Sequence, residues 1–166
     1  MDDAQIEFRK VMGLFTTGVC VVSVPGGEQG VTAMTVNSLV SVSLDPMLLC
    51  WSLQNDASQF DLYMSAPRFA VSILGHGQAE LALRYAARGD ALLKPQDFIE
   101  SAGGLPVIAG ALGHIECERW SDHLAGDHTM IFGEVRGLAH EPSFSTAAPL
   151  GFFNGRFCSI DPEWTP

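Results

Sequence analysis

Residues 30–46 read GVTAMTVNSLVSVSLDP, and this stretch predicts two β-strands. Gly30–Thr35 is expected to return antiparallel to Gly18–Val24, which is rich in β-branched residues and stops at the turn signal PGG, residues 25–27. Val40–Leu44 alternates apolar and hydroxyl side chains, which is the pattern of a half-buried strand, and Asp45-Pro46 ends it. The stretch therefore indicates a hairpin followed by a further strand.

More strands and a few short helices are expected on both sides of this stretch. The expected strands are Met47–Leu53, Arg68–Leu74, Ala111–Trp120, Thr129–Leu138 and Leu150–Phe157, and the expected helices are Ser58–Ser65, Gln78–Ala87 and one near the start through Ile6, Phe8, Val11, Met12 and Phe15. Residues 88–105 are expected to form a long loop of the kind that often serves as a lid or binding loop. Because the strands do not alternate regularly with helices, we expect one mainly β domain over residues 1–166, a closed or nearly closed antiparallel barrel with short helices.

The composition limits the partners. The chain has 166 residues, a formal net charge of −10 and a hydrophobic fraction of 47%. Its few Lys and Arg residues are dispersed, so a polyanion would be repelled and nucleic acid is not expected to bind. The high apolar fraction for so small a chain indicates that some surface is buried against another subunit.

The cysteines and the first residues indicate a cellular location. Cys20, Cys50, Cys117 and Cys158 form no C-x-x-C pair, and three of them lie in apolar or alternating runs, where buried reduced thiols are expected. The first residues lack the basic region and apolar run of a secretory signal, and no apolar stretch is long enough to span a bilayer. A cytoplasmic protein that does not bind membranes is expected.

Two segments are candidates for chemistry. Residues 30–43 carry small polar side chains at a strand end, which suit a flat heterocycle such as a flavin, although composition alone favours an ordinary strand-turn-strand with Thr and Ser on its wet face. Residues 120–129 read WSDHLAGDHT, and their two Asp-His pairs lack the further ligands that a metal site needs. Either Gly126 supplies a positive φ in a plain turn that Asp127 caps, or His128 lies at the mouth of a pocket and donates to a ligand amide. Glu116 and Glu118 are interpreted as a solvated strand face.

No serine-nucleophile elbow, Rossmann glycine pattern or P-loop is present, so any nucleotide must be bound by another fold. The chain instead resembles the flavin reductase-like family with the FMN-binding split-barrel fold, the small reductase components that supply reduced flavin to two-component monooxygenases. The resemblance runs almost end to end through FRKVMGLFTTGV at residues 8–19, the stretch 30–46, FAVSIL at 69–74, GDH at 126–128 and GRF at 155–157.

The resemblance implies an activity and a set of site residues. It implies an NAD(P)H-dependent flavin oxidoreductase that transfers hydride from NADH or NADPH to FMN or FAD, a homodimer with the flavin near the subunit interface, and a flavin-dependent monooxygenase as partner. The residues implied to line the isoalloxazine ring and the ribityl chain are Thr32, Ala33, Met34, Thr35, Asn37 and Ser38. His128 would be the catalytic-site residue that faces the nicotinamide or the exposed side of the flavin, and Arg156 would lie near the flavin or the dinucleotide.

The chain departs from the family pattern at residues 54–59, which read QNDASQ. Asn55 stands where a Lys or Arg is usual, and Asp56 brings negative charge to the place where the flavin phosphate would lie. Ser58 alone keeps the phosphate-binding pattern. Because like charges oppose each other, Asp56 is expected to cap the helix that follows.

Two other functions are compatible with the same residues. One is a reductase that holds FMN tightly and acts directly on a corrinoid, a metal chelate or an enone. The other is a non-enzymatic flavin- or haem-binding module on the same architecture. The sequence does not indicate whether FMN or FAD is the preferred flavin. It favours NADH over NADPH because no basic residue is placed to bind a 2′-phosphate.

Overall fold

The computed structural model describes residues 2–26, 30–86, 94–142 and 147–161. The helices are α1 (Asp3–Gly13), α2 (Phe60–Ser65) and α3 (Ala79–Ala86), with single 3₁₀ turns at His76–Gln78 and Pro95–Asp97. The strands are β1 (Thr17–Gly18), β2 (Cys20–Pro25), β3 (Val31–Val36), β4 (Val40–Leu44), β5 (Met47–Gln54), β6 (Arg68–Ile73), β7 (Phe98–Glu100), β8 (Pro106–Ile108), β9 (Gly113–Ala125), β10 (His128–His140), β11 (Leu150–Phe153) and β12 (Arg156–Ser159).

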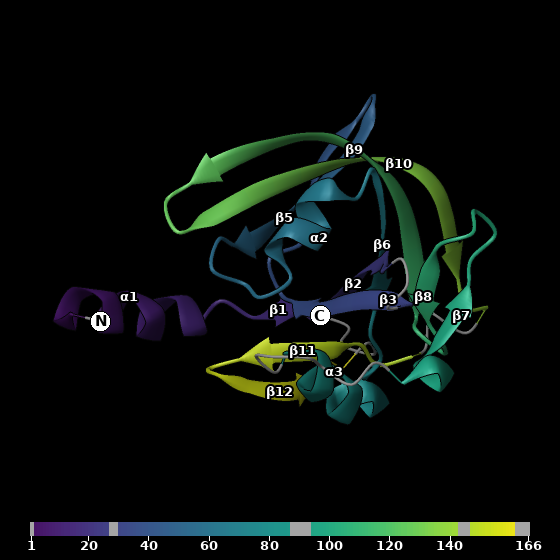
Figure 1. Cartoon of the computed structure of the whole chain (residues 1–166). Coiled ribbons are helices and arrows are strands. Elements are labelled where there is room, and N and C mark those ends of the chain that lie inside the picture. The colour runs from purple at the N-terminus through teal and green to yellow at the C-terminus, as the bar shows by residue number, and fades with distance from the viewer. Residues whose placement is uncertain (1, 27–29, 87–93, 143–146, 162–166) are drawn as a thin grey trace.

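Seven strands form one antiparallel sheet in the order β3-β2-β6-β9-β10-β5-β4. The sheet is strongly curved, because its two long strands β9 and β10 bend in an arc over the other strands (Figure 1). A three-stranded sheet β1-β11-β12 lies beside it, and β7 pairs with β8. The predicted hairpin is present, since β2 and β3 pair from Cys20↔Val36 to Pro25↔Val31. The prediction of a mainly β, antiparallel barrel with short helices is confirmed.

Trp51 lies at the centre of the barrel core. Its side chain is fully buried, and its ring packs edge-on against Tyr63 at 5.5 Å and Phe69 at 6.0 Å between centroids. Tyr63 belongs to α2, and its hydroxyl donates to the Val22 carbonyl at 3.0 Å. These contacts hold α2 against the inner face of the sheet.

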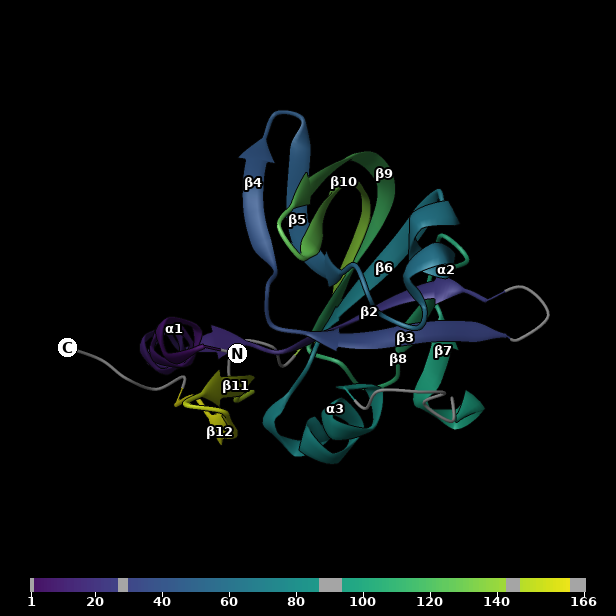
Figure 2. The same ribbon diagram turned by 60° about the vertical axis from the view of Figure 1, so that its left-hand side comes forward.

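A second core lies on the other face of the β2–β3 hairpin. Because successive side chains of a strand point to opposite faces, Val22 enters the Trp51 cluster and Val21 enters this one. Ala82 and Tyr85 of α3 pack here, and α3 lies beneath the hairpin in Figure 2. The hairpin is therefore packed between the two cores. This packing fixes the position of the residues that follow β3.

Three expectations about strands are corrected. Leu150–Phe157 is two strands, because Asn154 (φ 48°) and Gly155 (φ 75°) form a tight turn between β11 and β12. Residues 94–105 of the expected long loop contain β7, which pairs with β8, while residues 88–93 lie outside the described residues. The strand β4 is present but mostly exposed rather than half-buried, since it is the edge of its sheet.

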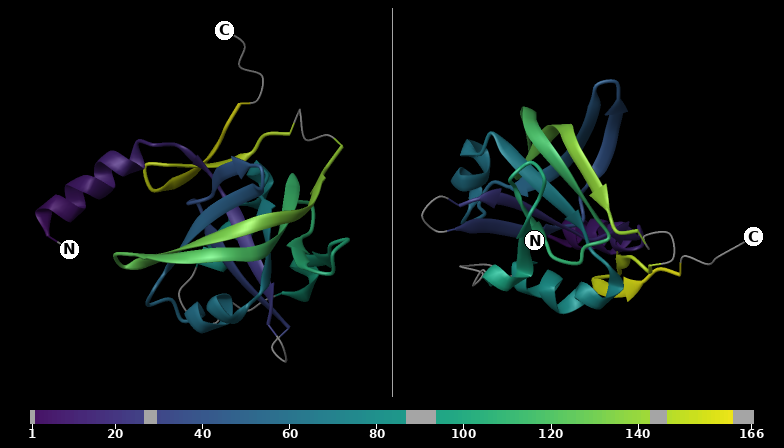
Figure 3. Two further views of the ribbon diagram at one scale, coloured as in Figure 1. Left: turned by 90° about the horizontal axis from the view of Figure 1, so that it is seen from above. Right: turned by 90° about the vertical axis from the view of Figure 1, so that its right-hand side faces the viewer.

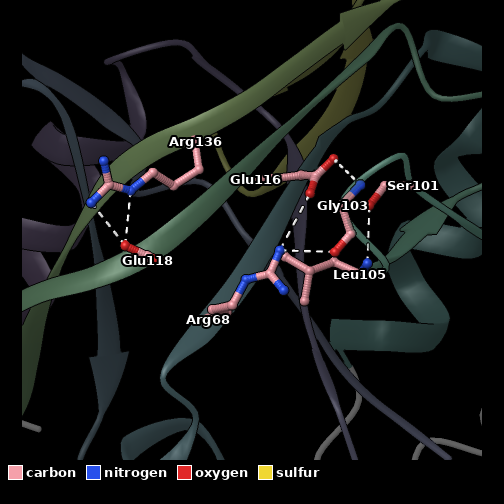
Figure 4. A network of polar contacts seen from close by, with 7 residues as sticks. All are labelled: Arg68, Ser101, Gly103, Leu105, Glu116, Glu118 and Arg136. Carbon is pink, nitrogen blue, oxygen red and sulfur yellow. Dashed lines mark hydrogen bonds and ion pairs between the residues drawn. The ribbon is translucent and has the colours of Figure 1, made fainter.

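The expectation that Glu116 is solvated is also wrong. Figure 4 shows its carboxylate turned toward Arg68 and the backbone of Gly103. Glu116 is only 5% exposed, accepts from the Gly103 amide at 3.1 Å and lies 3.6 Å from an Arg68 nitrogen. Glu118 remains at the surface, where it pairs with Arg136 at 2.8 Å. The loop through Gly103 covers one glutamate and leaves the other exposed.

The predicted first helix is present as α1, but it ends at Gly13, so Phe15 lies beyond it, and it buries none of its residues against the rest of the chain. Its first turn is closed by a capping box, in which Asp2 accepts from the Gln5 amide at 2.8 Å and Gln5 accepts from the Asp2 amide at 2.9 Å. The helix extends away from the barrel (Figure 3), and Phe8 and Phe15 are 66% and 69% exposed. An apolar helix surface is thus left uncovered by this chain.

The cysteines are all free, and three are buried as expected. Burial raises the pKa of the Cys20 and Cys117 thiols to about 12. Within the described residues, no helix combines the length and the apolar character needed to cross a bilayer.

Candidate active site

A cavity of about 780 Å³ opens between α1, β1, the end of β3 and the β11–β12 turn. Its walls are mainly apolar, with Phe15, Leu39 and Phe152 among them, and Asn37 and Ser38 provide polar groups at one side. The size and the lining are those of sites that hold drug-sized or cofactor-sized molecules. Among the described residues that line it, Arg9 is the charged side chain and there is no carboxylate.

Thr17 supplies an unpaired polar atom at this cavity. Its hydroxyl oxygen is buried and has no hydrogen-bond partner in the structure, although the residue lines the cavity wall. A buried polar atom without a partner is costly, by about 1–3 kcal/mol, unless a ligand or water satisfies it. Thr17 is held in place by β1, which pairs Thr17 with Phe152 of β11. The hydroxyl is therefore left unsatisfied beside the cavity.

The structure brings two of the predicted flavin-contacting residues to the cavity. Asn37 and Ser38 follow β3 and line the wall, and the Ser38 hydroxyl also accepts from the Ser52 amide at 3.0 Å. That bond ties the segment to β5 and leaves the hydroxyl proton of Ser38 for a ligand. The position of both residues follows from the sandwiched β2–β3 hairpin.

The other four predicted flavin contacts lie along β3 itself and are not among the residues that line the cavity. Thr32 and Ala33 are buried, and Met34 packs against the Trp51 cluster. The Thr35 hydroxyl donates to the Ala82 carbonyl of α3 at 2.8 Å. In the single chain these side chains hold the hairpin between its two cores, and their contact with a flavin stays a prediction.

His128 lies at the tip of the β9–β10 hairpin. Gly126 has a φ of 66°, as the turn interpretation predicted. The His128 side chain is 41% exposed, and its Nδ1 lies 2.7 Å from an Asp127 carboxylate oxygen. This hydrogen bond lowers the pKa of Asp127, so the carboxylate stays ionised and holds the ring. In the described part of the chain, no group of three or more His, Cys, Asp or Glu is placed to hold a metal.

The expectation that Asp56 caps α2 is wrong. The helix begins at Phe60 with Gln59 as its N-cap, and no side chain caps it. A turn intervenes, in which the Ala57 amide donates to the Gln54 carbonyl at 3.1 Å, and Asp56 is left exposed. Ser58, the predicted phosphate contact, is also exposed. Arg156, the other predicted site residue, begins β12 directly after Gly155, and Gly155 lines the cavity.

The curved antiparallel barrel carries an apolar cavity with a few polar groups at its wall, which is the usual form of a site for a small molecule or a cofactor. The family described as flavin reductase like domain matches residues 12–161. The chain therefore belongs to this family.

Individual relatives agree with this assignment. An FMN reductase (NADH) from Agrobacterium fabrum is 42% identical over 150 residues, which cover 90% of this chain and 83% of the relative. The reductase subunit of a flavin-dependent monooxygenase from Mycobacterium tuberculosis is 30% identical over 165 residues, covering 98% and 87%. The structure of the NADH:FAD oxidoreductase of Streptomyces globisporus C-1027, in complex with NAD and FAD fragments, matches with a TM-score of 0.88 and 34% identity over 97% of this chain and 95% of that one.

These findings confirm the predicted family and the split-barrel fold. The predicted class of activity, reduction of flavin by a nicotinamide nucleotide, is the class named for these relatives. The sequence alone did not identify Thr17 as a site residue. Thr17 lies in the stretch TTGV, residues 16–19, which is part of the resemblance to the family. Only the fold shows that its hydroxyl is buried at the cavity without a partner.

Proposed function

We propose that the protein is an NADH:flavin oxidoreductase that takes FMN or FAD as acceptor and supplies reduced flavin to a partner monooxygenase. The observation that carries the proposal is the 780 Å³ apolar cavity with the unpartnered Thr17 hydroxyl at its wall, in a chain of this family. NADH is chosen because the named relatives above use it.

The residues at the cavity fit a flavin. Apolar walls suit the faces of the isoalloxazine ring, and Asn37 and Ser38 at the wall offer hydrogen bonds to its polar edge. When bound, the flavin supplies the chemistry, because its N5 accepts the hydride from nicotinamide C4. The protein orients the two rings and excludes water, so a general acid or base is not required.

The charged end of the flavin is held differently from the family pattern. Arg9 supports binding of an anionic nucleotide because it is the cation among the described cavity-lining residues. Arg156 follows Gly155 at the cavity rim and is the second candidate, and Ser58 keeps its predicted contact with the phosphate. His128 is proposed to face the nicotinamide, where its ring would orient the dinucleotide rather than transfer a proton.

An absorbance assay tests the proposed function. Purified protein is mixed with NADH or NADPH, and FMN, FAD or riboflavin is then added in turn while nicotinamide oxidation is followed at its near-ultraviolet band. We expect rapid oxidation of NADH that depends on added flavin. Protein that retains its flavin through purification and reduces a second substrate instead would support the direct reductase, and protein that oxidises no nicotinamide with any flavin would support a binding module.

We further propose that the protein is a homodimer in the cytoplasm, with α1 in the subunit contact. The helix buries no residue within its own chain, and its exposed apolar side chains include Phe8 and Val11. Apolar surface of this kind is usually covered in the functional assembly. The four free cysteines agree with a reducing compartment.

Light scattering tests the dimer. We expect a mass of twice the 17.8 kDa of one chain, and Phe8→Asp combined with Val11→Asp should shift the protein toward the monomer. Leu83→Asp, at an exposed apolar position of α3, is the matched control and should leave the mass unchanged. A wild-type protein with the mass of one chain would contradict the proposal.

A further inference from the structure

Asn55 binds the tip of the β9–β10 hairpin through three hydrogen bonds. Its backbone amide donates to the Asp127 carbonyl at 2.9 Å, and its side-chain amide donates to the Gly126 carbonyl at 3.3 Å. Its side-chain oxygen accepts from the Thr129 hydroxyl at 2.8 Å. One residue at the end of β5 thus contacts the turn on both sides of His128.

The chemistry of the amide explains why this position holds Asn. A single short side chain here both donates and accepts, and it reaches two different residues of the turn. A Lys or Arg would supply donors only and could not accept from Thr129. Asn55 therefore fastens the hairpin through contacts that a cation at this position could not make.

The same contacts lead to the His128 ring. Asn55 holds the Asp127 backbone, and the Asp127 carboxylate holds the His128 ring at 2.7 Å. The strand register agrees, since His128 of β10 pairs with Gln54, the neighbour of Asn55. The hairpin reaches out from the barrel (Figure 1), so its tip depends on such contacts for a fixed position.

We propose that Asn55 is a positioning residue that fixes the Gly126-Asp127-His128 turn for binding of the nicotinamide. The proposal rests on the proposed function, because it gives the turn its ligand. It assigns Asn55 to the nicotinamide side of the reaction and not to the flavin phosphate.

Steady-state kinetics with NADH and flavin varied separately tests this role. Asn55→Ala removes two side-chain bonds and should lower kcat/KM for NADH roughly tenfold, while the KM for flavin changes less than about twofold. Thr129→Val removes one bond and should have a smaller effect in the same direction. Ser121→Ala, in the same hairpin but outside these contacts, should match the wild type in both parameters.

A double mutant separates positioning from general stability. If Asn55 acts through His128, Asn55→Ala combined with His128→Ala should be no slower with NADH than His128→Ala alone. Independent, multiplicative losses would overturn the proposal, and so would a loss in Asn55→Ala confined to the KM for flavin.

Hydrogen exchange gives a readout that needs no activity. The amides of Asn55 and of residues 126–129 should exchange faster in Asn55→Ala, with the central strands unchanged. Unchanged exchange at the turn would overturn the positioning role and leave the proposed function standing. A wild-type protein that oxidises no NADH would overturn the proposed function, whatever the exchange shows.

Discussion

Replacing Trp51 with alanine should lower the free energy of unfolding by about 3–5 kcal/mol, a loss that would leave little of the fold stable. The ring is fully buried and packs edge-on against Tyr63 and Phe69. Truncation removes the contacts by which α2 is held to the sheet and leaves a cavity that the barrel cannot fill by small movements. Urea unfolding followed by far-ultraviolet circular dichroism measures the loss without relying on the fluorescence of the residue removed.

A matched substitution distinguishes ring packing from the indole nitrogen. The Trp51 Nε1 is buried without a hydrogen-bond partner, so Trp51→Phe removes an unsatisfied donor and keeps an aromatic ring. We expect it to cost less than half as much as Trp51→Ala. Leu138→Ala, at a side chain that is 64% exposed, should change the free energy of unfolding by less than about 0.5 kcal/mol. Equal losses in Trp51→Phe and Trp51→Ala would contradict this account.

Local patterns in the sequence were sufficient for most of the fold. The β-branched runs and the turn signal at residues 25–27 predicted the β2–β3 hairpin, and the structure has it in register. The strands β5, β6 and β10 also lie where their apolar runs predicted them. The Asn154-Gly155 turn was missed although its signal is local, because an Asn-Gly pair between apolar residues is a strong hairpin signal.

Contacts between distant segments could not be predicted in this way. Glu116 is buried because the loop through Gly103 folds over it, and nothing near Glu116 in the sequence encodes that loop. Thr17 becomes a site residue only because β1, β11 and the end of β3 meet at one cavity. From the sequence, Asn55 is interpreted as the loss of a basic residue that would bind the flavin phosphate. In the structure its side chain contacts a turn more than seventy residues away. The family resemblance identified the activity, and the three-dimensional contacts are needed to assign individual roles.

Filling the cavity at Gly18 should abolish most of the activity without unfolding the protein. Gly18 lines the cavity, and a Cβ built there meets no atom within 4 Å, so the first atom of a larger side chain enters open space. Gly18→Leu would place that side chain where the flavin ring is proposed to bind. We expect kcat/KM for flavin to fall by about 100-fold, because a clash with the ligand opposes binding directly. Gly18→Ala should give a smaller loss.

The control for this prediction is another glycine with open space around it. A Cβ at Gly77 also meets nothing within 4 Å, but Gly77 lies in the turn before α3 and does not line the cavity. Gly77→Leu should therefore keep the activity, and both leucine variants should unfold within about 0.5 kcal/mol of the wild type. If Gly18→Leu kept its kcat/KM for flavin, the flavin would have to bind elsewhere, since a ring system and a leucine side chain cannot occupy the same wall of the cavity.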